Sequence, residues 1–183
     1  ASALSAEKPA EQDTFTYVYD PTDPKLTEGG ECLLTTGELR GSNELSPAGY
    51  RDDVISFISE PLTEDTTLAG NLVANLFVST DVEDTAFTYT ISEVDANGVA
   101  HNIRNGLLTL AYRNDRYAPA VYDYVPGEIV EMEIESLPID AELDFSGVEF
   151  QGIHPFTQPV RVKGEAACSA GVVTLRAAAE FRL

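Results

Sequence analysis

Residues 70–98, GNLVANLFVSTDVEDTAFTYTISEVDANG, decide the fold class of this chain. They predict two long strands joined by an acidic turn, and the second strand runs to an Asn-Gly turn. The alternating apolar positions are Leu72, Ala74, Leu76 and Val78 in the first strand and Phe87, Tyr89 and Ile91 in the second. Alternation with a period of two is typical of a half-buried sheet. Since each strand has one apolar face, a second layer must cover it, which predicts a β-sandwich or barrel.

The same alternation recurs on both sides of this stretch. Further strands are expected at 15–19, 53–59, 99–103, 107–113, 128–135, 142–150, 158–165 and 171–182, with turns at Asn97-Gly98 and Asn105-Gly106. In 128–135 the residues expected inside are Val130, Met132 and Ile134, with Glu131, Glu133 and Glu135 outside. The segments 25–50 and 114–127 predict loops, and residues 1–14 a linker or arm. The chain is therefore expected to be all-β, with a single β-sandwich domain over residues 15–183.

Composition narrows the classes of partner. The chain has 183 residues, of which 43% are hydrophobic, enough for one domain with a substantial core. Its 31 acidic residues against 11 basic residues give a formal net charge of −20. Such a charge repels phosphate backbones and anionic membrane surfaces, so neither nucleic acid nor membrane is expected as a partner. No apolar run approaches the ~20 residues of a spanning helix.

The chain terminus and the two cysteines leave the compartment open. The sequence starts without Met, and ASALSAEKPAEQD lacks the basic and apolar regions of a signal peptide, so a mature form or an excised fragment is expected. A bacterial protein, cytoplasmic or secreted, fits equally. Cys32 and Cys168 form no metal-type cluster. They are a disulfide or, in the preferred interpretation, two buried thiols, because free Cys packs as a small hydrophobe.

Candidate catalytic residues do not form a complete set. The segment ACSAG (167–171) imitates the nucleophile elbow of α/β-hydrolases around Ser169, but β-branched residues follow where the elbow needs a helix. A β-hairpin turn is therefore preferred. His101 and His154 are the two possible bases, and their spacing suggests no triad. Both are expected in turns, and no catalytic residue is assigned.

Two further clusters have chemical potential. Asp81, Glu83 and Asp84 lie close together in the acidic turn and could hold Ca²⁺, which binds six to eight oxygens; a solvated acidic turn is the competing interpretation. No other cofactor is expected. The loop after residue 111 carries four tyrosines that could form an interface or a carbohydrate platform, because tyrosine combines apolar area with a polar tip. They are Tyr112, Tyr117, Tyr122 and Tyr124.

Short motifs along the chain occur in an order that resembles a known family. They are LSAEKPA (4–10), YVYDPTDP (17–24), GG (29–30), RDDVISFISEPLTED (51–65), LFVSTDVEDTAF (76–87), DANGVAHNI (95–103), LAYR (110–113) and VPGEIVEMEI (125–134). This run, covering roughly residues 4–136, resembles the C-terminal jelly-roll domain of the X-prolyl dipeptidyl aminopeptidase, cocaine esterase and α-amino-acid ester hydrolase superfamily.

The resemblance implies a fold and a role. The fold is a jelly-roll β-sandwich of the galactose-binding-like kind. In the family, the catalytic serine, aspartate and histidine lie on a separate α/β-hydrolase domain, and the jelly roll packs on that domain and helps shape the substrate pocket. None of those three residues can be placed on this chain. It is therefore expected to be noncatalytic by itself, with a peptidase or esterase domain as its partner and weak self-association when separated from it.

Residues 136–183 depart from the family pattern. The Gly-His-Arg-containing strand and the Ser-Ser-Asn-Phe-Pro-like segment that normally close the domain are absent from the sequence. The segments SLPIDAE (136–142), FSGVEF (145–150), QPVRVKGE (158–165) and GVVTLRAAAEF (171–181) instead resemble the N-terminal β segment of YceD-like bacterial proteins linked to ribosomal RNA accumulation. Either the last strands have diverged, or the chain joins pieces of different origin.

Three functions remain compatible with the sequence. The first is the accessory jelly roll of a serine hydrolase, which the ordered motifs favour. The second is an independent carbohydrate- or ligand-binding module, which the tyrosine-rich loop favours. The third is a recombined or engineered chain without evolved activity, which the departing tail favours.

Overall fold

The computed structural model describes residues 2–4, 14–30, 41–63, 66–119, 123–143, 161–168 and 171–182. The strands are β1 (Ser2–Leu4), β2 (Thr14–Tyr19), β3 (Glu44–Leu45), β4 (Ile55–Ser59), β5 (Thr66–Thr80), β6 (Ala86–Val94), β7 (Ala100–Thr109), β8 (Val130–Leu143), β9 (Arg161–Cys168) and β10 (Gly171–Arg182). A 3₁₀ helix, η1 (Leu110–Tyr112), follows β7. None of the helices in this described part of the chain is long and apolar enough to cross a membrane.

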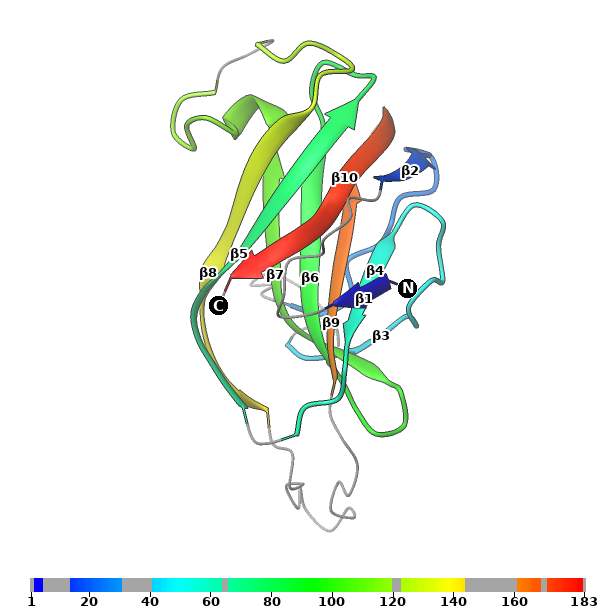
Figure 1. Cartoon of the computed structure of the whole chain (residues 1–183), viewed down its shortest axis with the longest axis vertical. Coiled ribbons are helices and arrows are strands. Elements are labelled where there is room, and N and C mark those ends of the chain that lie inside the picture. The colour runs from blue at the N-terminus through cyan, green and yellow to red at the C-terminus, as the bar shows by residue number, and fades with distance from the viewer. Residues whose placement is uncertain are drawn as a thin grey trace, which may run out of the picture.

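Two sheets face each other, which confirms the all-β sandwich (Figure 1). The first sheet has the strand order β1-β4-β9-β6-β7-β3 and the second β2-β10-β5-β8. From β4 onward the chain alternates between the sheets, except for the antiparallel hairpin of β6 and β7. Such alternation is typical of a jelly roll. The pair β1–β4 is parallel, so Ser2–Leu4 of the expected arm is a strand at the edge of the first sheet.

The two strands of the 70–98 stretch form as predicted, but they do not pair with each other. β5 lies in the second sheet and β6 in the first, so the acidic segment between them is a crossover from one sheet to the other. Alternation identified the buried face of each strand correctly: Leu72, Leu76 and Val78 of β5 are buried, as are Phe87 and Tyr89 of β6. The alternation of apolar residues does not show which strand pairs with β5 or with β6.

The turn at Asn97-Gly98 is confirmed, and the turn predicted at Asn105-Gly106 is wrong. Gly98 has a positive φ of 83° in the connection between β6 and β7. Gly106 instead lies inside the continuous strand β7, directly opposite Tyr89 of β6. A Cβ at Gly106 would fall within 3 Å of the Tyr89 ring, so the glycine provides the space in which that ring lies. The strand predicted at 107–113 likewise ends at Thr109, where η1 begins.

The core lies between the sheets and uses residues from both. It consists of a cluster that includes Tyr17, Phe57, Leu72, Leu76, Val78, Phe87, Tyr89, Leu110, Tyr124, Met132 and Ile134. Fully burying one such side chain contributes about 1.5–3 kcal/mol. Met132 and Ile134 are buried while Glu131 and Glu133 are exposed, which confirms the inward and outward faces predicted for 128–135.

The last three strands complete both sheets. β8 pairs with β5, β9 lies between β4 and β6, and β10 lies between β2 and β5. β9 and β10 belong to different sheets, so these two strands do not form the hairpin that the sequence suggested. The strands of the tail are therefore structural members of the sandwich. Whether that tail derives from a YceD-like ancestor stays a prediction.

Candidate functional site

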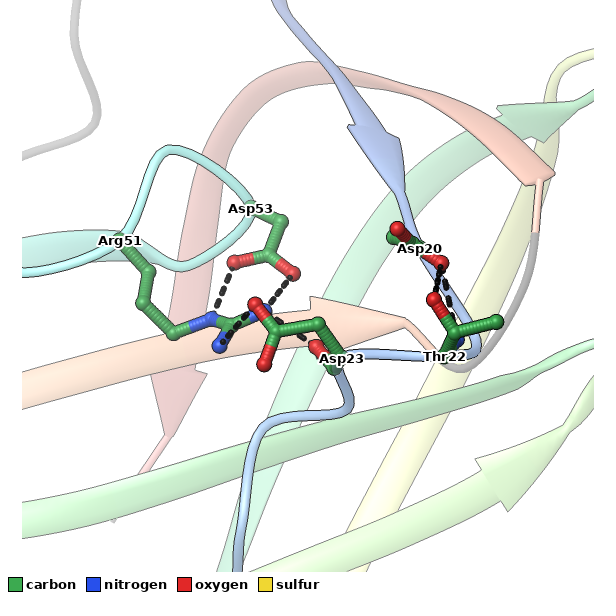
Figure 2. Close-up of polar contacts among 5 residues, drawn as sticks. All are labelled: Asp20, Thr22, Asp23, Arg51 and Asp53. Atoms are coloured by element: carbon green, nitrogen blue, oxygen red, sulfur yellow. Dashed lines mark hydrogen bonds and ion pairs between the residues drawn. The ribbon is translucent and has the colours of Figure 1, made fainter.

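An arginine-centred network holds the segment after β2 in place. Figure 2 shows the guanidinium of Arg51 between Asp53 and Asp23. Nε and Nη2 of Arg51 donate to the two carboxylate oxygens of Asp53 at 2.6 and 2.8 Å. Nη2 also donates to the backbone oxygen of Asp23 at 2.6 Å, and Nη1 lies 3.3 Å from its carboxylate. The fork therefore joins the segment that enters β4 to the segment that leaves β2.

The turn after β2 begins with a local cap. Oδ1 of Asp20 accepts hydrogen bonds from the backbone nitrogen and the hydroxyl of Thr22, at 2.8 and 2.7 Å. These bonds lower the pKa of Asp20. An aspartate that accepts from residue i+2 stabilises a turn, which explains why the DPTDP sequence ends the strand here.

Asp53 is buried, and its pKa is lowered chiefly by the hydrogen bonds from Arg51, against an opposing effect of burial. The pKa of Arg51 is raised, first of all by the same hydrogen bonds. Because a carboxylate with a lowered folded-state pKa favours the folded state only when ionised, its contribution is complete above the ordinary value of 3.8. It is lost as the pH falls through the lower folded-state value.

We expect Asp53→Asn to lower the melting temperature at pH 7 by roughly 3–8 °C, because the paired carboxylate is replaced by an amide. The difference from the parent protein should shrink as the pH falls below 3.8. Thermal unfolding followed by circular dichroism between pH 3 and 7 measures both effects. The matched control is Asp52→Asn at the exposed neighbouring position, which should change little. Equal changes of the melting temperature in the two variants would show that the Arg51 network does not stabilise the fold.

The segment held by Arg51 forms one wall of a cleft of about 270 Å³. Tyr19, Lys25, Thr27 and Glu28 come from this segment, while β6 and β7 contribute the opposite side. Thr88 and Thr90 of that side lie on the outer face of the first sheet, because they alternate with the buried Phe87 and Ile91. Tyr89, Gly106 and Leu45 of β3 also line the cleft. The carboxylate of Glu28 accepts from the backbone nitrogen and hydroxyl of Ser46 at 3.3 and 3.4 Å, which fixes the wall at a second point.

The four tyrosines of the predicted interface have different environments. Tyr117 is 96% exposed and Tyr112 is 38% exposed, whereas Tyr124 is buried at 4%. The hydroxyl of Tyr124 lies within hydrogen-bonding distance of the backbone nitrogen and oxygen of Thr80 and of the oxygen of Glu128. Tyr124 thus belongs to the core and offers no surface to a partner. Tyr122 lies outside the described residues.

The loop that carries Tyr117 is held in place on both sides. Nη1 of Arg113 donates to Asp123 at 2.6 Å, and Asn114 donates to the same carboxylate at 3.1 Å. Arg116 forms an ion pair with Glu135 of β8 at 3.1 Å. The exposed ring of Tyr117 is therefore presented from a segment with defined contacts.

The acidic trio between β5 and β6 is not assembled around a common point. Asp81, Glu83 and Asp84 are exposed, and Oδ1 of Asp84 accepts from the backbone nitrogen of Ala111 at 3.0 Å. Asp84 thus supports η1. In the part of the chain that is described, no three His, Cys, Asp or Glu side chains are grouped as a metal site would require.

Of the candidate bases, the structure describes His101, and of the elbow-like segment it describes the residues on either side of Ser169. His101 lies within β7, in register with Glu93 of β6 and Glu44 of β3, so its expected turn position is wrong. Burial raises the pKa of Glu93, and the nearby His101 opposes that shift. Cys168 ends β9 and Gly171 begins β10, so strand follows strand where an elbow needs a helix. Ser169, His154 and Cys32 lie outside the described residues.

Sequence reasoning missed the Arg51 network and the cleft. Residues 20–28 have no hydrophobic periodicity, so their sequence predicts only a turn and a loop. A signal was nevertheless present: an Asp-Pro-Thr-Asp-Pro turn and an Arg-Asp-Asp motif provide the opposite charges of a loop clamp. The partners are 28 residues apart, and only the fold shows that they meet.

Comparisons with known proteins agree with this architecture. Residues 1–144 match the family of X-Pro dipeptidyl-peptidase C-terminal non-catalytic domains. The chain belongs to this family. A cocaine esterase from Rhodococcus sp. (strain MB1 Bresler) is 34% identical to it over 134 residues, which are 73% of this chain and 23% of the esterase. The X-Pro dipeptidyl-peptidase C-terminal domain described here thus spans less than a quarter of that relative.

Solved structures show that the fold extends beyond the family match. An aminopeptidase from a marine sediment archaeon (Thaumarchaeota) covers 100% of this chain with a TM-score of 0.71 at 20% identity, and the match takes up 35% of that protein. An α-amino acid ester hydrolase covers 70% of this chain, with a TM-score of 0.54, 17% identity and 24% of its own length. Because the aminopeptidase match includes β9 and β10, the strands beyond residue 144 also belong to a known arrangement.

Proposed function

We propose that this X-Pro dipeptidyl-peptidase C-terminal domain is the noncatalytic accessory domain of a serine peptidase or esterase, and that it docks on an α/β-hydrolase domain and helps shape its substrate pocket. The observation that carries the proposal is the family match over residues 1–144 in a chain whose strands form two facing sheets. The Rhodococcus cocaine esterase is much longer than the matched region, which leaves room for a separate catalytic domain.

The best candidate for the docking surface is the tyrosine-loop surface, defined here as Tyr112, Tyr117, Val125 and Ile129. All four are exposed side chains with apolar surface, and they belong to the connection between β7 and β8. The described part of that connection lies at the end of the sandwich where β5 finishes (Figure 1). Exposed aromatic residues on a fixed loop lose little conformational freedom on binding and often dominate interface energy. The remaining surface belongs to a chain of net charge −20, and unpaired charges are depleted from interface centres.

A tyrosine-loop surface separated from its partner should cause weak self-association. We expect association to strengthen with salt, because repulsion between −20 chains is screened within about 10 Å at 0.1 M and about 3 Å at 1 M. Tyr117→Ala should weaken it by about tenfold or more, as expected for an exposed aromatic anchor. Sedimentation velocity at low and high salt provides the measurement.

The control for this experiment is Leu107→Ala, which removes an exposed apolar side chain outside the tyrosine-loop surface. It should leave association unchanged. A strict monomer at millimolar concentration in both salts, or equal effects of the two substitutions, would contradict the assignment of the docking surface.

A further inference from the structure

We propose that the cleft between residues 19–28 and the outer face of β6 and β7 binds a small monocarboxylate with hydroxyl or amide groups, held by the ammonium group of Lys25. This site lies apart from the tyrosine-loop surface, since none of the residues that line it belongs to that surface. The proposed binding site can therefore be tested separately from the proposed docking function.

The floor of the cleft is a sheet surface that the core does not use. Thr88 of β6 lies opposite Leu107 of β7, and Thr90 lies opposite Asn105. All four line the cleft. Their neighbours in β6, Phe87 and Tyr89, are buried, so these four side chains face outward by the alternation of the strands. A floor made from two paired strands is rigid, which favours a preformed site.

Several polar groups of the cleft are left without partners. Within the described residues, the Lys25 ammonium, the Thr27 and Thr90 hydroxyls and the Asn105 amide form no hydrogen bond or ion pair. Among the described residues, Arg51, Arg113 and Arg116 all have carboxylate partners, whereas half-buried Lys25 has none. Convergent polar groups in a concave site with some apolar surface are the usual composition of a ligand site.

The charges of the cleft select the class of ligand. Lys25 provides one positive charge, and Glu28 provides a negative charge nearby. A carboxylate monoanion is attracted by the Lys25 ammonium group and can keep its single charge away from Glu28. A phosphate dianion would be repelled by the Glu28 carboxylate. A ligand hydroxyl could donate to Glu28, whose contacts to Ser46 are long. We therefore expect a carboxylate, oriented by Lys25, on a molecule that also carries donors.

Size and apolar surface limit the ligand further. The volume of about 270 Å³ lies just below the range of drug-sized pockets, so a monosaccharide or a single amino-acid derivative fits best. Tyr19 and Leu107 provide apolar contact for the body of such a molecule. Sugar acids and N-acyl amino acids share this chemistry, and both are tested below.

The test uses the whole chain and four probes: glucuronate, N-acetylalanine, glucose and inorganic phosphate, followed by isothermal titration calorimetry at low ionic strength. We expect saturable binding of one or both carboxylates in the millimolar range or tighter, and weaker binding of glucose and phosphate. Whichever carboxylate binds more tightly distinguishes the sugar acid from the amino-acid derivative. Lys25→Met keeps the aliphatic stem and should reduce that affinity by about tenfold or more.

Two control variants test whether the positive charge at position 25 is what binds the carboxylate. Lys25→Arg should retain most of the affinity, and Arg116→Met, which removes a cation outside the cleft, should retain all of it. Lys25 has no ion pair in the described structure, so Lys25→Met should melt within about 2 °C of the parent protein. Absence of saturable carboxylate binding, unchanged affinity in Lys25→Met, or equally tight binding of glucose would overturn the proposal.

Discussion

Replacing Gly106 by alanine is expected to destabilise the fold by about 2–3 kcal/mol, the upper part of the range for overpacked cores. The added Cβ would lie within 3 Å of the ring of Tyr89. That ring is buried, and its hydroxyl donates to the backbone oxygen of Leu72 at 2.8 Å, so it has little freedom to move. Denaturant unfolding gives the free energy, and the melting temperature should fall by roughly 4–12 °C.

The neighbouring position provides the control for Gly106. Leu107→Ala changes an exposed residue of the same strand and should alter stability by less than about 0.5 kcal/mol. If the ring of Tyr89 causes the strain, a Tyr89→Leu background should make Gly106→Ala less costly than it is in the parent protein. A Gly106→Ala protein as stable as its parent would show that the ring can shift.

Tyr124→Phe is expected to cost about 1–3 kcal/mol, because it removes one hydroxyl that serves two separate segments. That hydroxyl accepts from the backbone nitrogen of Thr80 at 2.9 Å and lies 2.8 Å from the oxygen of Glu128. Phenylalanine keeps the buried ring and leaves the Thr80 nitrogen without this acceptor. Hydrogen exchange at Thr80 should accelerate, and the melting temperature should fall by roughly 2–10 °C.

Tyr117→Phe is the matched control for Tyr124→Phe, since the same atom is removed from a ring that is 96% exposed. It should leave stability unchanged within about 0.5 kcal/mol. The comparison separates the two roles that the tyrosine-rich loop combines, a structural one for Tyr124 and a binding one for Tyr117. Equal losses in both variants would contradict this division.

The faces of the strands could be predicted from the sequence, because burial of one face imposes a period of two. β5, β6 and the start of β8 all follow this pattern, with Leu76, Phe87 and Met132 buried as expected. Asn75 is an exception: it alternates with the buried Ala74 and Leu76, yet it is also buried. β5 lies between β10 and β8, so residues of both neighbouring strands flank Asn75 on the outer face of the sheet.

The partners of the strands could not be predicted in the same way. Asn97-Gly98 and Asn105-Gly106 are chemically alike, and only the first is a turn. At Asn105-Gly106 the strand continues, and Gly106 makes room for the ring of Tyr89, which lies 17 residues earlier in the chain. The crossover between β5 and β6 is equally invisible in the sequence, because an acidic turn suits a hairpin and a change of sheet alike.

The candidate sites show the same division. Composition identified a tyrosine-rich loop, but backbone geometry decides that Tyr117 points outward and Tyr124 inward. The Ca²⁺ hypothesis followed from the spacing of three carboxylates and stays a prediction; the hydrogen bond from Ala111 to Asp84 could not be predicted from that spacing. Lys25 could not be predicted as a binding residue, because a single lysine in a loop belongs to no sequence pattern. Its significance comes from neighbours on β6 and β7 that lie more than 60 residues away.

The central claim is that this chain carries no catalytic site of its own, and reaction with a serine-directed fluorophosphonate tests it most directly. The purified chain is incubated with the probe and an aminoacyl ester, with the Rhodococcus cocaine esterase as a positive control. Intact-mass spectrometry should show the unmodified chain, and ester hydrolysis should match the rate without protein. Stoichiometric labelling at Ser169 that disappears in Ser169→Ala, together with turnover of the ester, would contradict the account.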